Sequence, residues 1–131
     1  PGSGAAGGMG YAAKALFKAT LKPGIQVVME QVCFERVLDG TDLVITGEGR
    51  LDGQSLAGKT PLGISRLASE RGIPVVAIAG QLGERWRDCY HHGVTAAFSL
   101  IDGPMSLQEA VSNTPSLLAD RCESVARLYS F

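Results

Sequence analysis

Residues 42–63 read DLVITGEGRLDGQSLAGKTPLG, a strand–loop–helix pattern from which the fold class follows. The opening, Leu43–Ile45, is a short apolar run rich in β-branched residues, which predicts a buried strand. Thr60 and Pro61 are typical of a helix start, where a capping hydroxyl precedes proline at the first helical position. Between them we predict a polar, glycine-rich loop, Thr46–Lys59. Connections of this length are usually functional, so the candidate site is placed in this loop.

After this stretch, apolar runs alternate with helical patterns. Val75–Ala79 and Thr95–Ile101 predict two more buried strands, with helices expected at Pro61–Arg71 and Glu84–His92. A short loop, Gly80–Gly83, is expected after the second strand. The alternation predicts an α/β fold with a parallel sheet, flanking helices and right-handed connections. Ligands of such sheets bind beyond the carboxyl ends of the strands, which is where the polar loop lies.

The two ends of the chain are predicted to be helical. Met9–Leu21 carries apolar residues on one face and lysines on the other, and Pro23 is expected to stop this helix. Residues 25–38 predict two short helices. Ser106–Glu109 is a capping box that begins the C-terminal helical region, and Thr114–Pro115 is expected to break or kink it.

Composition restricts the class of protein. The chain has 131 residues, 45% of them apolar and 19% charged, which suits one ordinary globular core. The net charge of −1 comes from scattered residues, so neither a nucleic acid nor a membrane surface is expected as a partner. Cys33, Cys89 and Cys122 show no CxxC spacing and are expected to be free, buried thiols in a reducing compartment. With no signal peptide visible, we expect a cytoplasmic location.

Three charged residues alternate along the predicted loop, namely Glu48, Arg50 and Asp52. Two carboxylates and a guanidinium suit metal chelation, general-base catalysis and the capture of a carboxylate or phosphate. The alternative is a solvated loop whose charges only pair with one another. Ser55 has no histidine in the loop to activate it, so a catalytic triad is poorly supported.

Two glycine patterns point to anion binding. Residues 53–60 match the P-loop pattern GxxxxGKT, but six residues separate the predicted strand from Gly53, and Pro61 removes an amide donor. Lys59 and Thr60 could still bind an anion at the helix N-terminus without that fold. Residues 1–10 contain GxGxxG without a preceding strand, and favour a loop that covers a ligand over a dinucleotide site.

The motif TGEGRLDGQSLAGKTPLG at residues 46–63, together with PGSGAAGGMG at residues 1–10, resembles the type I glycerate kinases. These bacterial enzymes phosphorylate D-glycerate with ATP to give 2-phosphoglycerate. The resemblance covers essentially the whole chain but only the C-terminal portion of the family. It implies a Rossmann-like, three-layer partial domain of a two-domain kinase. Residues 1–22 would then end the second, inserted domain, and residues 23–131 would form the C-terminal part of the Rossmann-like domain.

The resemblance also implies the ligands and the site. ATP and Mg²⁺ are the expected cofactors, glycerate is the expected substrate, and the missing N-terminal part of the same protein is the expected partner. The expected catalytic residues are Glu48, Arg50, Asp52 and Lys59, with Glu48 and Asp52 as candidate magnesium ligands or bases. Substrate and nucleotide would be bound by Gly47, Gly49, Gln54, Ser55, Thr60, Ser3 and Gly4. The chain alone is expected to be inactive, so a non-catalytic ligand-binding half-domain is the alternative.

Overall fold

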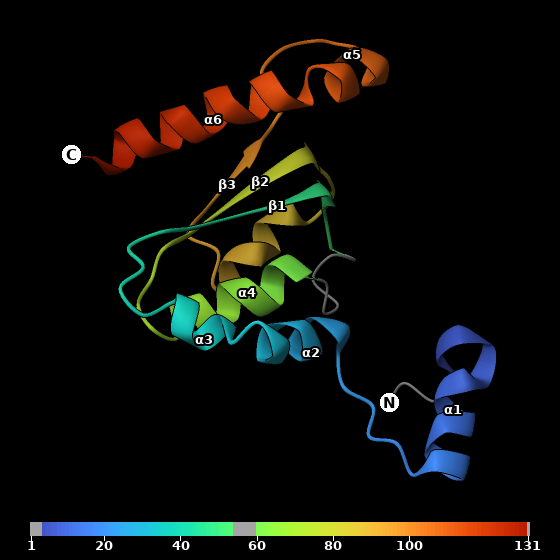
Figure 1. The fold of residues 1–131 in the computed structure, drawn as a ribbon. Helices are drawn as coiled ribbons and strands as arrows, with labels where there is room; N and C mark the ends of the chain where they lie inside the picture. Colours follow the sequence, from blue (N-terminus) through green and yellow to red (C-terminus); the bar gives the residue numbers. More distant parts are fainter. Residues whose placement is uncertain (1–3, 54–59, 131) are drawn as a thin grey trace. The chain divides into compact units, whose positions relative to one another are not determined.

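The structure is a computed structural model, which describes residues 4–53 and 60–130 (Figure 1). The chain divides into two compact units, Pro1–Phe34 and Glu35–Phe131. This boundary falls later than the predicted domain boundary after residue 22. Within the first unit, Lys22 forms an ion pair with Glu30 of the following helix, with 2.8 Å between Nζ and Oε2. The assignment of the two segments to the two domains of a kinase stays a prediction.

The first unit contains two helices, α1 (Ala5–Phe17) and α2 (Gly24–Gln31). The helix predicted at Met9–Leu21 is present, but it ends four residues early because Lys18 takes a left-handed conformation with φ of 52°. Positive φ values at Ala6, Gly7 and Gly8 interrupt the first turns of α1, as a glycine-rich opening allows. Pro23 is the N-cap residue of α2, so the Pro-Gly pair begins a helix rather than only ending one.

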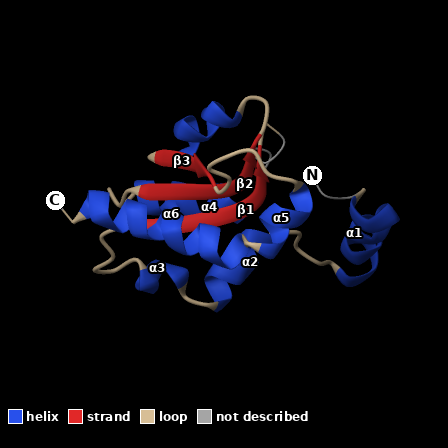
Figure 2. Cartoon of the chain, turned by 90° about the horizontal axis from the view of Figure 1, so that it is seen from above, coloured by secondary structure: helices blue, strands red, loops and turns tan. Residues whose placement is uncertain are grey.

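The second unit is built on a three-stranded parallel sheet. Its strands β1 (Val44–Leu51), β2 (Val75–Leu82) and β3 (Ala96–Ser99) lie in the order β1-β2-β3. Figure 2 shows the strands side by side in that order. Val44 pairs with Val75 and Val76 with Ala96, both in parallel register. The predicted α/β class with a parallel sheet is therefore confirmed.

The boundaries of the first two strands differ from the prediction. We expected β1 to end at Ile45 and a loop to follow, but β1 continues through Leu51 and pairs with β2 on both sides of Gly49, from Val44 to Glu48 and at Arg50 and Leu51. Likewise β2 continues through the predicted loop Gly80–Gly83 as far as Leu82. Pairing between the two backbones outweighs the low strand propensity of the glycines, because propensity depends on context. Glu48 and Arg50 are consequently strand residues.

Helices cover both faces of the sheet, as a three-layer fold requires. Figure 1 shows α5 (Leu107–Ser112) and α6 (Thr114–Tyr129) on one side and α4 (Thr60–Ser69) on the other. The predicted break at Thr114–Pro115 is confirmed, since α6 begins there. None of the helices in the described part of the chain is long and apolar enough to cross a bilayer.

The remaining helices are short. The helix α3 (Phe34–Val37) confirms, with α2, the two short helices expected in residues 25–38. The helix expected around Glu84–His92 is present as a 3₁₀ helix, η1 (Trp86–His92). Arg85, just before η1, has a φ of 58°, and this left-handed residue prevents an α-helix from beginning at Glu84.

Two apolar clusters fill the space on either side of the sheet. Leu51, Leu62, Ala77 and Cys89 belong to the cluster beneath α4 and η1. Gly93, which ends η1 with a φ of 91°, packs so tightly on α4 that an added Cβ would lie 2.7 Å from the Ser65 carbonyl oxygen. Burial of these aliphatic side chains supplies most of the stability of such a fold.

The cluster on the other face joins the sheet to α6. Val76 and Ile78 pack against Val125 of α6, with Phe98 and Cys122 beside them. At the end of α6, the Tyr129 hydroxyl donates a hydrogen bond of 2.6 Å to the carbonyl of Asp42, just before β1. The three cysteines are free thiols, as predicted, although Cys33 is exposed.

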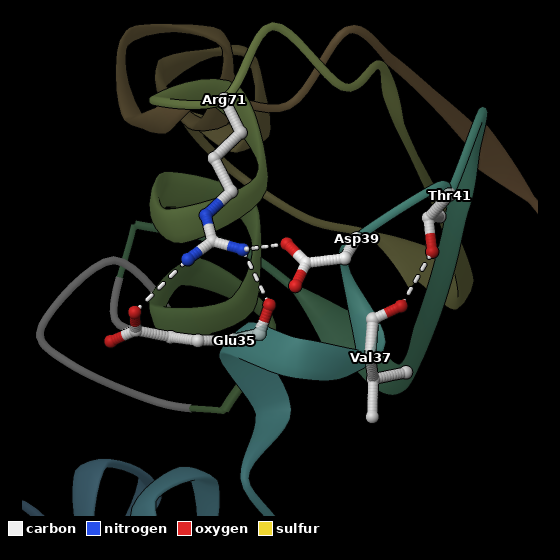
Figure 3. A network of polar contacts seen from close by, with 5 residues as sticks. All are labelled: Glu35, Val37, Asp39, Thr41 and Arg71. Atoms are coloured by element: carbon white, nitrogen blue, oxygen red, sulfur yellow. Dashed lines mark hydrogen bonds and ion pairs between the residues drawn. The ribbon is translucent and has the colours of Figure 1, made fainter.

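A polar network fastens the connection between α3 and β1 to the end of α4 (Figure 3). The guanidinium of Arg71 donates to the main-chain carbonyl of Glu35 and forms ion pairs of 3.0 Å with Glu35 Oε2 and 3.3 Å with Asp39 Oδ1. Nearby, the Thr41 hydroxyl donates a 2.7 Å hydrogen bond to the Val37 carbonyl. Exposed ion pairs contribute little each, so this network mainly fixes where β1 begins.

The capping box predicted at Ser106–Glu109 is confirmed. Ser106 Oγ accepts from the Glu109 amide at 3.2 Å, and Glu109 Oε2 accepts from the Ser106 amide at 2.8 Å. The Ser106 side chain, followed by its backbone amide, lowers the pKa of Glu109 by hydrogen bonding to the charged carboxylate. A lowered folded-state pKa means that this contribution is present above the pKa of the unfolded carboxyl. It is lost as the pH falls through the folded-state value.

Ser106→Ala is expected to lower the free energy of unfolding by about 1 kcal/mol at neutral pH, because the helix loses its N-cap. The difference in the free energy of unfolding between Ser106→Ala and the wild type should become smaller as the pH falls through the pKa of Glu109. Urea titrations at several pH values measure both effects. Ser124→Ala is the matched control, since that serine lies inside α6 and its hydroxyl donates only to the Asp120 carbonyl. An equal loss in the two variants would contradict the capping role.

Candidate active site

The charged end of β1 lies at the carboxyl edge of the sheet, where the topology placed the candidate site. Arg50 Nε lies 2.9 Å from Asp52 Oδ2. The Asp52 side chain is only 18% exposed, whereas that of Arg50 is 57% exposed. The ion pair therefore holds a mostly buried carboxylate in place beside an arginine side chain that is more than half exposed. Two of the predicted catalytic residues are in this way brought together.

The residues that follow β2 lie beside the end of β1 and bind its backbone. The Gly83 amide donates a 2.8 Å hydrogen bond to the Leu51 carbonyl, and the Gly53 amide donates one of 3.0 Å to the Glu84 carbonyl. A Cβ at Gly83 would lie 2.9 Å from Asp52 Cβ and 3.0 Å from Arg50 Nε. Only glycine lets the end of β2 approach the ion pair this closely.

Gly83 and Glu84 were not among the residues that the motif singled out. They lie outside the conspicuous polar segment, and Glu84 acts through its main-chain carbonyl. The signal that could have identified them is topological, because neighbouring parallel strands end at the same edge of the sheet. The residues that follow β2 should therefore support those that follow β1.

Glu48 lies further back along β1, paired with Ala79 in the sheet. Burial raises the pKa of the nearby Cys89 thiol, and the charges of Asp88 and Glu48 raise it further. The Glu48 carboxylate is thus close enough to η1 to influence Cys89, and its Oε1 atom is buried. Glu48 therefore lies behind the Arg50–Asp52 pair, where its carboxylate acts on Cys89 and the residue also lines the cavity described next.

Gly47 and Gly49 line a cavity of about 660 Å³ between the sheet and the helices α5 and α6. Both were predicted to bind substrate or nucleotide. The other walls are mostly aliphatic and come from β2, from the segment after β3 and from the two helices; they include Ile78, Gly80, Leu100, Ile101, Leu107, Ala110, Val111, Thr114 and Leu118. The cavity opens at the same strand that carries Arg50.

Several predicted site residues cannot be placed. Ser3, Gln54, Ser55 and Lys59 lie outside the described residues. Thr60 is the first residue of α4, but its side chain is likewise outside the description. Gly4 is an exposed residue preceding α1, in the first unit. The roles expected for these residues stay predictions.

The P-loop alternative predicted a strand that ends at Asp52, and β1 does end next to it, at Leu51. The predicted gap of six residues between the strand and Gly53, which was the argument against a P-loop, is therefore absent. However, the Gly53 amide already donates to the Glu84 carbonyl, so the first glycine of the pattern is tied to the protein rather than turned to an anion. The rest of that loop lies outside the described residues.

Metal binding was expected from Glu48 and Asp52 together. Within residues 4–53 and 60–130, no set of three His, Cys, Asp or Glu side chains is arranged to hold a metal ion. Asp52 directly follows Leu51, the last residue of β1. Because an extended strand rises about 3.3 Å per residue, the backbone of Glu48 lies roughly 10 Å from that of Leu51. Mg²⁺ commonly takes only one or two carboxylates and completes its shell with water and substrate phosphates.

Comparisons with known proteins agree with the sequence motif. The family model described as "Glycerate kinase family" matches residues 1–130. The chain is 44% identical over 131 residues to the glycerate kinase of Halalkalibacterium halodurans, covering all of this chain and 34% of that protein. It is 44% identical over 110 residues to the glycerate 2-kinase of Escherichia coli, covering 84% of this chain and 29% of that protein.

A solved structure shows the same fold. The crystal structure assigned to glycerate kinase 2 of Salmonella typhimurium LT2 matches 98% of this chain and 33% of its own, with a TM-score of 0.75 and 38% sequence identity. The chain thus spans about a third of the length of these relatives.

Proposed function

The chain belongs to the glycerate kinase family, and we propose that it acts as the C-terminal third of an enzyme that phosphorylates D-glycerate with ATP. The product would be 2-phosphoglycerate, and the enzyme would work in the cytoplasm. The relative from Escherichia coli, which bears the name glycerate 2-kinase, supports this choice of hydroxyl. The observation that carries the proposal is the Arg50–Asp52 ion pair at the carboxyl edge of the sheet.

Phosphoryl transfer requires positioning and charge neutralisation more than covalent chemistry from the protein. In our proposal Asp52 either accepts the proton of the glycerate hydroxyl or holds Mg²⁺ against the phosphates of ATP. The 18% exposure of its side chain and its contact with Arg50 fix its direction. Arg50, which is more exposed, contacts the substrate carboxylate or a phosphate. Bound Mg²⁺ would supply positive charge for the transferring phosphoryl group.

Lys59 and Thr60 would complete the anion site at the N-terminus of α4. Helix N-termini favour anions because their first amides have no partners within the helix. Gln54, Ser55, Ser3 and Gly4 are proposed to contact substrate or nucleotide, as the family motif implies. Glu48 is proposed to support Asp52 from behind.

The rest of the polypeptide is proposed as the partner of this chain. In the described part of the sheet, β1 is an edge strand that pairs on one side only, with β2. Long edge strands are normally paired or covered. We therefore propose that further strands of the complete enzyme continue the sheet beyond β1 and bring the remaining substrate contacts.

The 131-residue chain alone is expected to show no phosphorylation of D-glycerate above background, because it supplies only part of the proposed site. The complete polypeptide should convert D-glycerate to 2-phosphoglycerate. ATP consumption measured with and without glycerate gives the rate, and ³¹P NMR distinguishes the 2-phosphate from the 3-phosphate. Turnover by the short chain would show that the whole site lies within it. No turnover by the complete polypeptide would refute the proposed function.

A further inference from the structure

The cavity between the sheet and α5–α6 is a candidate ligand site, and Gly47, Glu48 and Gly49 of the family motif form one of its walls. Its volume of about 660 Å³ lies within the range of roughly 300–1,000 Å³ that is typical of small-molecule sites. All of its lining residues belong to the second unit. It opens on β1 next to the Arg50–Asp52 pair and therefore at the edge where ligands of parallel sheets bind.

Gly49 is the residue that points to a ligand. It lies inside β1 without a positive φ, and an added Cβ would meet no atom within 4 Å. Neither backbone conformation nor packing within the described chain requires glycine there, although a strand glycine costs about 0.5–1 kcal/mol relative to alanine. Its neighbours differ, since a Cβ at Gly47 would lie 3.0 Å from the Ile78 carbonyl oxygen and one at Gly80 would lie 2.7 Å from the Gly49 carbonyl oxygen. A glycine inside a strand marks a bulge or the close approach of another backbone or of a ligand. The space on the side-chain side of Gly49 contains no described atom, which leaves room for a ligand there.

The chemistry of the walls distinguishes between the two substrates of a glycerate kinase. Leu100, Leu107, Val111 and Leu118 give the cavity an aliphatic surface, and none of the described residues lining it is a lysine or arginine. Glycerate is small and anionic, and burying its carboxylate against aliphatic walls without a cation is costly. A nucleobase with its ribose is uncharged and largely flat, and it gains from apolar contact. The exposed Gln81 and the backbone at Gly49 offer polar groups at the rim.

We propose that the adenine and ribose of ATP occupy this cavity over Gly49, with the phosphates directed along β1 toward Arg50 and Asp52. The inference rests on the proposed function for the identity of the nucleotide. It adds three points to that function: where the base binds, why residue 49 is a glycine, and in which direction the phosphates leave the cavity.

The test uses the complete polypeptide and fills the cavity from β1. Gly49→Val suits a strand, meets no neighbour and places its methyl groups in the cavity. It is expected to raise the KM for ATP at least about tenfold while changing the KM for glycerate less than about twofold. Gly49→Ala should give a smaller rise. Gly103→Val is the matched control, since Gly103 also has open space around it but does not line the cavity.

A second variant changes a residue of α5 on the opposite wall of the cavity. Val111 is 65% exposed, so Val111→Asp should not disturb folding, but it places a carboxylate beside the proposed base. It too should raise the KM for ATP. An unchanged KM for ATP in both variants of an active enzyme would overturn the inference, as would equal increases in both KM values. A marked loss of thermal stability in Gly49→Val would also overturn it, because another part of the polypeptide would then fill the cavity.

Calorimetry separates failure of this inference from failure of the proposed function. Adenosine carries the base and ribose without phosphate, whereas tripolyphosphate carries the phosphates without the base. Adenosine is expected to bind the wild type and not Gly49→Val, while tripolyphosphate binds both alike. If the wild type does not phosphorylate glycerate, the proposed function fails, and loss of adenosine binding in Gly49→Val would still support the cavity. If the wild type does not bind adenosine, the inference is wrong.

Discussion

Asp52→Asn in the complete glycerate kinase is expected to lower kcat by at least about 100-fold, the low end for loss of a positioned base. The asparagine keeps the size of the side chain but removes the charge that would accept a proton or hold Mg²⁺. The carboxylate it replaces lies 2.9 Å from Arg50 and is mostly buried, so solvent cannot readily substitute for it. The measurement is kcat at saturating ATP and glycerate, with circular dichroism as a check on folding.

The matched control for this variant is Asp39→Asn. Asp39 also pairs with an arginine, Arg71, at 3.3 Å, but it lies in the connection before β1 and its side chain is 77% exposed. This control should leave kcat nearly unchanged. Raising the Mg²⁺ concentration should partly restore Asp52→Asn if the carboxylate holds the metal, and should not if it is the base. Turnover near that of the wild type in Asp52→Asn would exclude both roles.

Gly93→Ala is expected to lower the free energy of unfolding by about 3 kcal/mol, combining a left-handed backbone with an overpacked contact. Gly93 has a φ of 91°, and its new Cβ would lie 2.5 Å from Ser69 Oγ and 2.7 Å from the Ser65 carbonyl oxygen. The Ser69 hydroxyl can turn away, but the Ser65 carbonyl is part of α4 and cannot move without bending that helix. The shift of the urea midpoint measures the loss.

Gly72→Ala separates the two causes. Gly72 has a φ of 73°, but no atom lies within 4 Å of an added Cβ, so only the backbone term should appear, at about 1 kcal/mol. The difference between the two variants measures how tightly the end of η1 packs on α4. Equal losses in Gly72→Ala and Gly93→Ala would show that this close contact is not present in solution.

The layers of the fold followed from apolar periodicity, because buried strands and helix faces leave clear patterns. Val75–Ala79 and the run before Ile101 were predicted as strands, and both pair in the parallel sheet. The ends of the strands were wrong, since Gly47 and Gly49 look like loop residues when read one at a time. Their place in a strand comes from the pairing of Gly47 and of the residues around Gly49 with β2, and such partners are not visible in a local stretch of sequence.

The candidate site could be anticipated only in part. Arg50 and Asp52 were identified from their alternation, and that spacing places both on one face of an extended chain. Gly83, which allows them their close contact with β2, left no local signal. A helix was predicted around Glu84–His92, but its 3₁₀ form could not be, because the left-handed Arg85 that precedes η1 is not a glycine.

The bond between Tyr129 and Asp42 has a consequence for biosynthesis. All three strands leave the ribosome before α6, so Val76 and Ile78 have no cover on the α6 side while translation continues. In this state the nascent chain exposes an apolar surface that can bind chaperones or aggregate with other copies. Val76 and Ile78 gain the cover of α6 only after that helix has been synthesised, and a stop codon a few codons before Tyr129 would remove the hydrogen bond that ties α6 to the start of β1.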